Sequence, residues 1–163
     1  MIPAVLCPGT YDPITCGHTA IISRAAAIFG HATVVVMNNS EKRTMFSADR
    51  RFEMAKAAFE GRTDVDVCLC GGLLADYALS LGGAVIVKGV RDGADFSYEM
   101  NIAQINRSLG GVETLLLPSD GGTSFISSTF VRDLIIYGRS TEGYVPAAVG
   151  ELISRYHGHE PGR

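Results

Sequence analysis

A repeated change of hydrophobic period constrains this chain more than any other feature. Short apolar runs rich in β-branched residues alternate with longer segments of helical spacing, and most of the helical segments stop at a glycine. A short continuous apolar run is typical of a parallel strand buried on both faces. A glycine just beyond a helical segment is typical of a helix C-terminus. The pattern predicts an α/β fold built on a five-stranded parallel sheet.

The expected strands are Ile2–Cys7, Ala32–Met37, Val65–Cys70, Ala84–Val87 and Glu113–Leu117. The expected helices are His18–Phe29, Ala48–Glu60, Leu73–Leu81, Ala94–Leu109, Ser128–Tyr137 and Pro146–Tyr156. Strict alternation of strand and helix predicts a Rossmann-like sheet with helices on both faces. A length of 163 residues suits one such domain. We therefore expect a single domain over residues 1–163, with a polar tail at about 157–163.

The charge balance excludes some classes of partner. The chain has 14 Lys and Arg residues against 17 Asp and Glu, a net charge of −3. This balance argues against a protein that coats nucleic acid or an anionic membrane. No apolar stretch approaches the roughly 20 residues of a membrane span, and Met1 to Cys7 lacks the basic flank of a signal peptide. We expect a cytoplasmic protein that binds neither nucleic acid nor membrane.

The four cysteines are too few for a disulfide scaffold in a chain of this length. We therefore expect four reduced thiols. Cys68 and Cys70 are two apart in an expected strand, and we expect them to point to opposite faces and not to share a metal. The sequence predicts no metal site made by protein side chains.

Ligands of parallel α/β sheets bind beyond the carboxyl ends of the strands. Several of these exits, which are residues 8–13, 38–42, 71–74, 88–91 and 118–128, carry glycine or cationic side chains. Such a rim on an acidic protein favours a small polyanion such as a nucleotide, although glycine and lysine are also ordinary loop residues. The Walker pattern G-x-x-x-x-G-K-[ST] and the dinucleotide pattern G-x-G-x-x-G are both missing. The phosphates therefore need another kind of site.

Two segments are candidates for that site. The first segment, residues 9–18, reads Gly-Thr-Tyr-Asp-Pro-Ile-Thr-Cys-Gly-His. Its last four residues open the first expected helix, where unpaired backbone N–H groups and the helix dipole favour an anion. Gly17 would let a phosphate approach the backbone, and His18 adds a directed donor. The second segment, residues 126–132, reads Ile-Ser-Ser-Thr-Phe-Val-Arg and spans the start of the helix expected over Ser128–Tyr137. Its hydroxyl residues also fit a simple helix N-cap.

Together these segments resemble the T-x-G-H and I-S-S-T-x-x-R signatures of the nucleotidyltransferase superfamily. The segments between them, Asn39–Lys42 with Met45–Phe46 and Lys88–Arg91 with Asp95–Glu99 and Asn106, resemble the bacterial phosphopantetheine adenylyltransferase family. The similarity runs from about Val5 to Leu134. Two positions depart from the family pattern, since residue 88 is Lys where Arg is usual and residue 123 is Thr where an aromatic is expected.

The resemblance implies transfer of the adenylyl group of ATP to 4′-phosphopantetheine, giving dephospho-coenzyme A and pyrophosphate in coenzyme A synthesis. It also implies Mg²⁺ held mainly by the ATP phosphates, and a homohexamer. Two alternatives stay open: another adenylyl- or cytidylyltransferase of the superfamily, acting on nicotinate mononucleotide or a polyol phosphate, and a non-catalytic nucleotide sensor on the same fold.

The resemblance also assigns roles to residues. His18, Lys42 and Arg91 would be catalytic, with His18 stabilising the transition state, and Thr10, Lys42, Leu74 and Lys88 would bind the acceptor substrate. The ATP site would comprise Thr10, Tyr11, His18, Gly89, Val90, Arg91, Glu99, Ser124, Phe125, Ile126, Ser127, Ser128, Thr129 and Phe130. Without the motif, Glu99 would read as a helix-surface carboxylate and Arg91 as a solvated loop charge.

The residues themselves agree with this chemistry, because no nucleophilic triad or carboxylate pair is evident in the sequence. A substrate phosphate with a second pKa of about 6 is already largely dianionic at pH 7 and needs no general base. It needs in-line placement and cancellation of negative charge.

Overall fold

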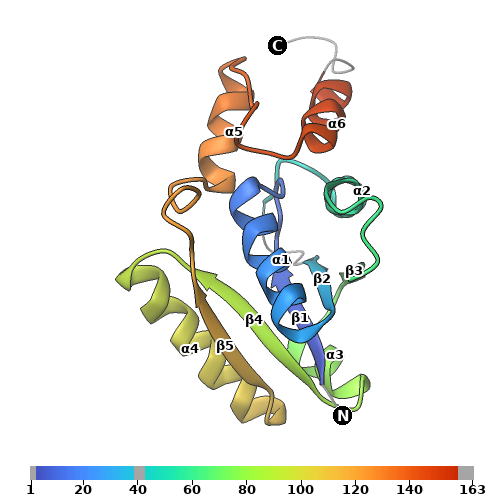
Figure 1. The fold of residues 1–163 in the computed structure, drawn as a ribbon, viewed down its shortest axis with the longest axis vertical. Coiled ribbons are helices and arrows are strands. Elements are labelled where there is room, and N and C mark those ends of the chain that lie inside the picture. The colour runs from blue at the N-terminus through green and yellow to red at the C-terminus, as the bar shows by residue number, and fades with distance from the viewer. Residues whose placement is uncertain (1–2, 39–42, 158–163) are drawn as a thin grey trace.

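Five strands form one parallel sheet in the computed structural model, which describes residues 3–38 and 43–157 (Figure 1). The strands are β1 (Ala4–Gly9), β2 (Ala32–Met37), β3 (Val65–Cys70), β4 (Ala84–Val90) and β5 (Glu113–Pro118). Their order in the sheet is β3-β2-β1-β4-β5, and each neighbouring pair is parallel. The first three strands therefore follow one another toward one edge of the sheet, and β4 and β5 are added on the other side of β1. The boundary between β1 and β4 is the switch point at which such sheets bind ligands.

Helices cover both faces of this sheet, as the sequence predicts. They are α1 (Cys16–Phe29), α2 (Ala48–Ala58), α3 (Leu74–Ser80), α4 (Gly93–Gly110), α5 (Ser128–Ile136) and α6 (Ala147–His157). The helices α1 and α2 pack on one face, and α3 and α4 on the other (Figure 1). Side chains of β1 alternate accordingly: Val5 and Cys7 join the core under α1 and α2, and Leu6 joins the core under α3. The Rossmann-like α/β domain is confirmed.

The two central strands run further at their carboxyl ends than the sequence predicts. Gly9 still pairs with Val36, and Lys88 to Val90 pair with β5, so these residues belong to strands and not to loops. Proline and glycine are poor strand formers and read as loop signals. Packing explains Gly9, because a Cβ there would lie 2.7 Å from the Tyr11 ring.

Helix ends differ from the expected ones by a few residues. α1 begins at Cys16, two residues before the expected start, because Thr15 caps it, and α2 ends two residues early at Ala58. α4 ends at Gly110, where Gly111 adopts a left-handed conformation with φ of 65°. The expected polar tail is wrong at its first residue, because His157 is the last residue of α6. Residues 158–163 lie outside the described residues.

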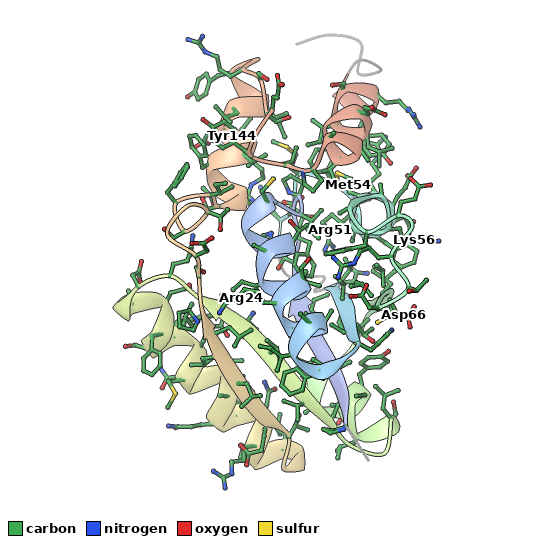
Figure 2. The ribbon with its side chains drawn as sticks, viewed as in Figure 1. Arg24, Arg51, Met54, Lys56, Asp66 and Tyr144 are labelled. Carbon is green, nitrogen blue, oxygen red and sulfur yellow. The ribbon has the colours of Figure 1, made fainter. Side chains whose placement is uncertain are left out.

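A long-range contact fixes α1 on the sheet. The Arg24 guanidinium of α1 donates to the Pro118 carbonyl at the end of β5, and Figure 2 shows its side chain reaching from the helix. This contact links segments 94 residues apart. It holds the last strand next to the helix whose N-terminus faces the switch point.

The expectation for Cys68 and Cys70 was wrong. Both side chains pack toward the core under α3, because residues two apart in a strand share a face. The Tyr77 hydroxyl donates to the Cys68 sulfur at 3.3 Å. All four cysteines are free thiols. No helix within residues 3–38 and 43–157 is long and apolar enough to cross a membrane.

Candidate active site

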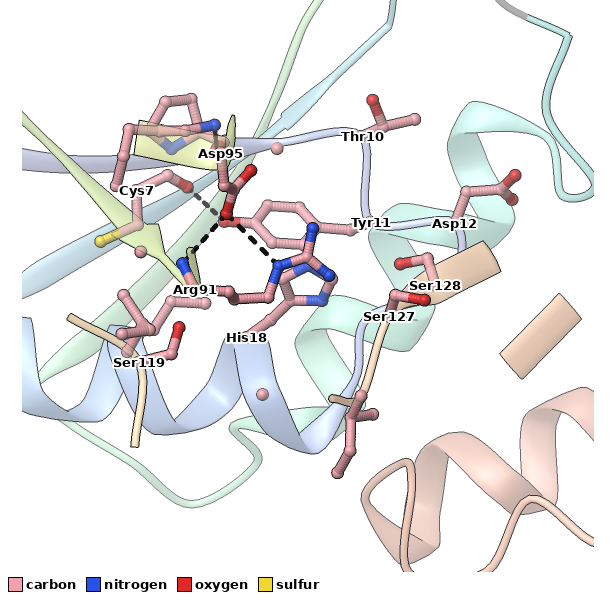
Figure 3. Close-up of a pocket in the computed structure, with 18 of the residues that line it drawn as sticks. Cys7, Thr10, Tyr11, Asp12, His18, Arg91, Asp95, Ser119, Ser127 and Ser128 are labelled. Carbon is pink, nitrogen blue, oxygen red and sulfur yellow. Dashed lines mark hydrogen bonds and ion pairs between the residues drawn. The ribbon is translucent and has the colours of Figure 1, made fainter. Parts of the chain in front are cut away.

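A cleft of about 480 Å³ opens at the carboxyl ends of β1 and β4 (Figure 3). Its walls come from the end of β1 and the loop after it, the first turns of α1, the end of β4, the start of α4 and residues 119–132. The cleft therefore brings the two halves of the sequence signature, 110 residues apart, onto one surface. Its size lies within the range of about 300–1,000 Å³ that is usual for small-molecule sites.

His18 lies at the start of α1 in a reciprocal cap. The Thr15 backbone N–H donates to His18 Nδ1 at 3.1 Å, and the His18 backbone N–H donates to Thr15 Oγ1 at 3.4 Å. A ring nitrogen that accepts a backbone N–H carries no proton, so the proton of the neutral ring is on Nε2. The cap therefore fixes the tautomer and leaves Nε2–H to donate to a ligand in the cleft.

The His18 ring is neutral at physiological pH. Burial, followed by the nearby charges of Lys88 and Arg91, lowers the pKa of His18 to about 4. The first turn of a helix also disfavours a positive charge. A neutral donor at this position offers a hydrogen bond to phosphate oxygen at any pH near 7.

Tyr11 supports the His18 ring from behind. Its own ring packs edge-on against His18 with centroids 5.1 Å apart, and its hydroxyl donates to the Cys7 carbonyl at 2.7 Å. Tyr11 has a φ of 50°, which is unusual for a residue with a side chain. Its backbone turns the chain out of β1 while the ring stays in the core, so Tyr11 positions His18.

Two glycines allow the walls of the cleft to approach closely. A Cβ on Gly17 would lie 3.2 Å from the Thr123 carbonyl oxygen and 3.3 Å from that of Ile126. A Cβ on Gly89 would lie 2.7 Å from the Ile21 side chain. Close packing against residues 123 and 126 therefore explains the glycine at position 17, in addition to the phosphate approach expected from the sequence. Gly89 lets α1 lie against β4.

Carboxylates from α4 orient two cations of the cleft. Lys88 Nζ lies 3.1 Å from Glu99 Oε1 and donates to the Pro8 carbonyl at 3.3 Å. Arg91 Nε lies 3.3 Å from Asp95 Oδ2 in the first turn of α4, and Figure 3 marks this contact with a dashed line. Glu99 is one of the two buried residues recorded for α4, so it is not a surface carboxylate. Both cations are thus oriented before any anion binds.

Asp12 and Arg132 close the opposite wall. The Arg132 guanidinium donates to the Asp12 carbonyl at 2.8 Å and lies 3.6 Å from its carboxylate. The buried Asp12 carboxylate also accepts the backbone N–H groups of Met45 and Phe46, at 2.8 and 2.9 Å. One carboxyl group therefore joins the loop after β1, the segment before α2, and α5.

The three hydroxyl residues before Phe130 have separate partners. Ser127 is the N-cap of α5 and accepts the Phe130 N–H at 3.1 Å, so the capping interpretation is confirmed for this residue. The Ser128 hydroxyl donates to the Pro13 carbonyl, and Thr129 Oγ1 accepts from Arg132. The segment is thereby held against the loop after β1.

Most of the residues expected from sequence come together in the cleft. Those that line it are Thr10, Tyr11, His18, Lys88, Gly89, Arg91, Glu99, Ile126, Ser127, Ser128 and Thr129. Those that do not are Leu74, Val90, Ser124, Phe125 and Phe130. Lys42 falls outside the described residues.

Sequence reasoning missed several cleft residues. Asp12, Asp95, Arg132 and Ser119 all line it. The signal for Asp12 and Arg132 was present, because both belong to the signature segments, but their mutual contact spans 120 residues. Asp95 is four residues beyond Arg91, but Arg91 precedes the N-cap of α4, so no helix-pair spacing identifies this contact from the sequence.

The donor set of the cleft does not resemble a metal cage made by protein. Within residues 3–38 and 43–157, no three His, Cys, Asp or Glu side chains are grouped so that they could hold a metal ion. The cleft carboxylates Asp12, Asp95 and Glu99 each lie against a cation. A divalent ion here would depend chiefly on oxygens supplied by a ligand.

The fold and the cleft define a class of protein. A family model described as cytidylyltransferase-like matches residues 6–134, which span β1 to α5 and include both signature segments. The chain belongs to this family.

Closer relatives narrow the family. The phosphopantetheine adenylyltransferase of Symbiobacterium thermophilum is 44% identical over 147 residues, covering 90% of each chain. That of Porphyromonas gingivalis is 41% identical over 138 residues, covering 85% of this chain and 90% of its own. That of Bifidobacterium longum is 39% identical over 151 residues, covering 91% of each. Within the cytidylyltransferase-like proteins, the chain is a member of the phosphopantetheine adenylyltransferase family.

Proposed function

We propose that this protein transfers the adenylyl group of ATP to 4′-phosphopantetheine, in coenzyme A synthesis. An oxygen of the acceptor phosphate forms the new bond to the α-phosphorus of ATP. The bond from that phosphorus to the bridging oxygen breaks, and the electron pair leaves with pyrophosphate. The products are dephospho-coenzyme A and pyrophosphate.

The observation that carries the proposal is the neutral His18 donor in a cleft that also holds Lys88, Arg91 and Arg132. Phosphoryl-type transfer needs little covalent chemistry from the protein, only placement and stabilisation of charge. The acceptor phosphate is already anionic at pH 7, so the reaction needs no general base to activate it. The names of the relatives support the choice of acceptor.

Each cleft residue then has a role. His18 Nε2–H donates to the α-phosphate and stabilises the transition state, and Arg91 binds the other ATP phosphates. Thr10 contacts phosphate, and Lys88 neutralises the acceptor phosphate once it exchanges Glu99 for the ligand. The remaining assignments rest on the family resemblance alone. By that resemblance Lys42 contacts the phosphates, Leu74 the pantetheine arm, and ATP contacts Tyr11, Gly89, Val90, Glu99 and residues 124–130. Of these, Leu74, Val90, Ser124, Phe125 and Phe130 do not line the cleft.

Mg²⁺ fits this arrangement as an ion held mainly by the ATP phosphates, because the carboxylates of the cleft already face cations. When bound, the ion supplies charge neutralisation on the phosphate oxygens. The chain contributes the cations around those oxygens.

The family resemblance implies a homohexamer in the cytoplasm. Support for self-association comes from α4, which carries five large apolar side chains that are all more than a third exposed: Phe96, Tyr98, Met100, Ile105 and Leu109. Large exposed apolar patches of this kind mark interaction surfaces.

The deciding experiment is incubation of the purified chain with ATP, Mg²⁺ and 4′-phosphopantetheine, with mass-spectrometric detection of dephospho-coenzyme A. Parallel reactions contain nicotinate mononucleotide or glycerol 3-phosphate as acceptor, and CTP in place of ATP. Formation of dephospho-coenzyme A alone is the expected result. Product from another acceptor or nucleotide would favour a different transferase, and ATP binding without pyrophosphate release would favour a nucleotide sensor.

A further inference from the structure

Arg51 is a buried cation that the reaction described above does not use. It lies in the first turn of α2 with only 1% of its surface exposed. Its Nε donates to the Phe46 carbonyl at 3.2 Å, and one terminal nitrogen donates to the carbonyls of Thr10, at 2.5 Å, and Met37, at 2.8 Å. One guanidinium thus joins three separate stretches of backbone.

Thr10, whose carbonyl Arg51 holds, lines the candidate active site, and Phe46 lies two residues beyond the cleft residue Thr44, so the guanidinium lies behind the rim of the cleft. Thr10 follows the last residue of β1, Met37 is the last residue of β2, and Phe46 precedes the N-cap of α2. Figure 2 shows Arg51 in the interior, between α2 and the central strands. The side chain therefore sets the spacing between the carboxyl ends of two strands and the start of a helix.

Asp12 holds the same rim from the other side. Its carboxylate accepts the N–H of Phe46, whose carbonyl accepts from Arg51. Burial lowers the pKa of Arg51, and the charge of Asp12 acts in the opposite direction. Burying a guanidinium is costly unless its donors are satisfied, so an apolar side chain would serve a purely structural role as well or better.

We propose that Arg51 is a positioning residue that places Thr10 and the loop after β1 for in-line transfer. It touches no reacting atom and acts through backbone carbonyls. The inference rests on the proposed function, because it names the residue that holds the backbone of that active site in position. A displacement of about 1 Å at a transfer site can lower the rate about 100-fold.

The test compares Arg51→Met, Arg51→Lys and two control variants of the same helix. Arg50→Met removes an exposed charge that stacks on Tyr156 at 4.6 Å. Met54→Ala opens a cavity at a fully buried position without touching the three carbonyls. All four are compared with the unaltered chain by thermal unfolding, steady-state kinetics and equilibrium ATP binding, well below each unfolding midpoint.

In Arg51→Met we expect kcat to fall about 10- to 100-fold, while the Kd for ATP changes less than about threefold. Arg51→Lys recovers part of the loss, because an ammonium still donates to carbonyl oxygens. Met54→Ala lowers the unfolding midpoint but keeps kcat, and Arg50→Met keeps both near the original values. Loss of kcat in Met54→Ala to the same degree, equal loss in Arg51→Lys and Arg51→Met, or an unchanged kcat in Arg51→Met would overturn the proposal.

A second measurement does not depend on the reaction. Amide hydrogen exchange at Met45 and Phe46 should accelerate in Arg51→Met and not in Met54→Ala. If the unaltered chain makes no dephospho-coenzyme A, the proposed function fails. The exchange result then still tests whether Arg51 holds the backbone at residues 45 and 46. If it does, and the exchange at residues 45 and 46 stays slow in Arg51→Met, only the Arg51 inference fails.

Discussion

At the scale of single residues, His18 combines two properties that seldom occur together. It lies among cations, yet its ring is an uncharged donor, because burial and the charges of Lys88 and Arg91 lower its pKa to about 4. The backbone N–H of Thr15 fixes which nitrogen carries the proton. A charged imidazolium would repel the two cations and the helix N-terminus. The neutral form avoids this and still strengthens its hydrogen bond as charge develops on phosphate.

His18→Ala should lower kcat about 100- to 1,000-fold, or about 2.7–4 kcal/mol, which is typical for the loss of one donor to a developing charge. Equilibrium ATP binding should change much less, because the contact strengthens mainly in the transition state. Turnover and ATP titration calorimetry on the folded variant provide the check. A fall in kcat below about tenfold, or one that merely follows ATP affinity, would make His18 a binding residue.

The depressed pKa of His18 also predicts a pH dependence of stability. Between pH 6.5 and about 4, the unfolded chain binds a proton at this residue and the folded chain does not. Stability contributed by neutral His18 is therefore present above pH 6.5 and is lost as the pH falls toward 4, by at most about 3–4 kcal/mol. Urea unfolding at pH 7 and pH 4.5 should show a larger loss for the unaltered chain than for His18→Gln. Equal losses in the two proteins would contradict the assigned pKa.

At the scale of elements, α4 carries the carboxylates that hold the cations of β4 and its exit. Glu99 faces Lys88, and Asp95 faces Arg91, so one helix orients a positive charge of β4 and one just beyond it. The Asp92 side chain caps this helix by accepting the Asp95 N–H at 2.8 Å. Arg91 thereby stays near the cleft even though it follows the last strand residue.

The two cations should affect different substrates. Lys88→Ala should raise the KM for 4′-phosphopantetheine about 10-fold or more, which is the usual size of a hydrogen bond to a charged group. Arg91→Ala should instead raise the Kd for ATP by a similar factor. Steady-state kinetics with each substrate varied, together with ATP calorimetry, separates the two. Lys88→Arg should be tolerated, because a planar guanidinium can hold two phosphate oxygens.

A control for Lys88→Ala is needed because the substitution leaves Glu99 buried and unpaired. The double variant Lys88→Ala, Glu99→Gln removes both charges. If this double variant regains the original KM for phosphopantetheine, the effect of Lys88→Ala came from the orphaned carboxylate and not from lost phosphate binding.

At the scale of the whole molecule, the outer surface of α4 is unlike that of an ordinary surface helix. Its buried residues Glu99 and Asn106 are polar, while several large apolar side chains lie exposed among its outward polar ones. Tyr98, Ile105 and Leu109 lie on one stripe of the helix, at spacings of seven and four residues. An exposed apolar stripe of this kind is typical of an interaction surface, and we expect a neighbouring copy to cover it.

Ile105→Lys should therefore weaken self-association. We expect the unaltered chain to sediment at about six times its mass of 17.3 kDa, and the variant to shift to smaller species at micromolar concentration. Ile28→Lys, at a 60% exposed position of α1, is the matched control. A monomeric unaltered chain would contradict the hexamer, and an unchanged assembly in Ile105→Lys would exclude this stripe from the interface.

The amino-acid sequence by itself determined the order of strands and helices, because the hydrophobic period and the glycine stops are local signals. It also identified Thr15–His18 and the segment from Ile126 to Arg132, since each signature is short. Local signals failed where residues respond to distant neighbours. Gly89 reads as a loop residue but belongs to a strand, because it pairs with Leu117 of β5. The residue is a glycine because Ile21 of α1 lies where a Cβ would be.

Only the tertiary structure decided the charge states and partners in the cleft. The pKa of His18 depends on burial and on cations some 70 residues away, and no pattern within α1 contains that information. The pairs Lys88–Glu99 and Asp12–Arg132, and the contact of Arg51 with three carbonyls, likewise exist only once the strands are side by side. Periodicity and caps act over a few residues, whereas electrostatics and close packing depend on distances in space, which the folded sheet alone sets.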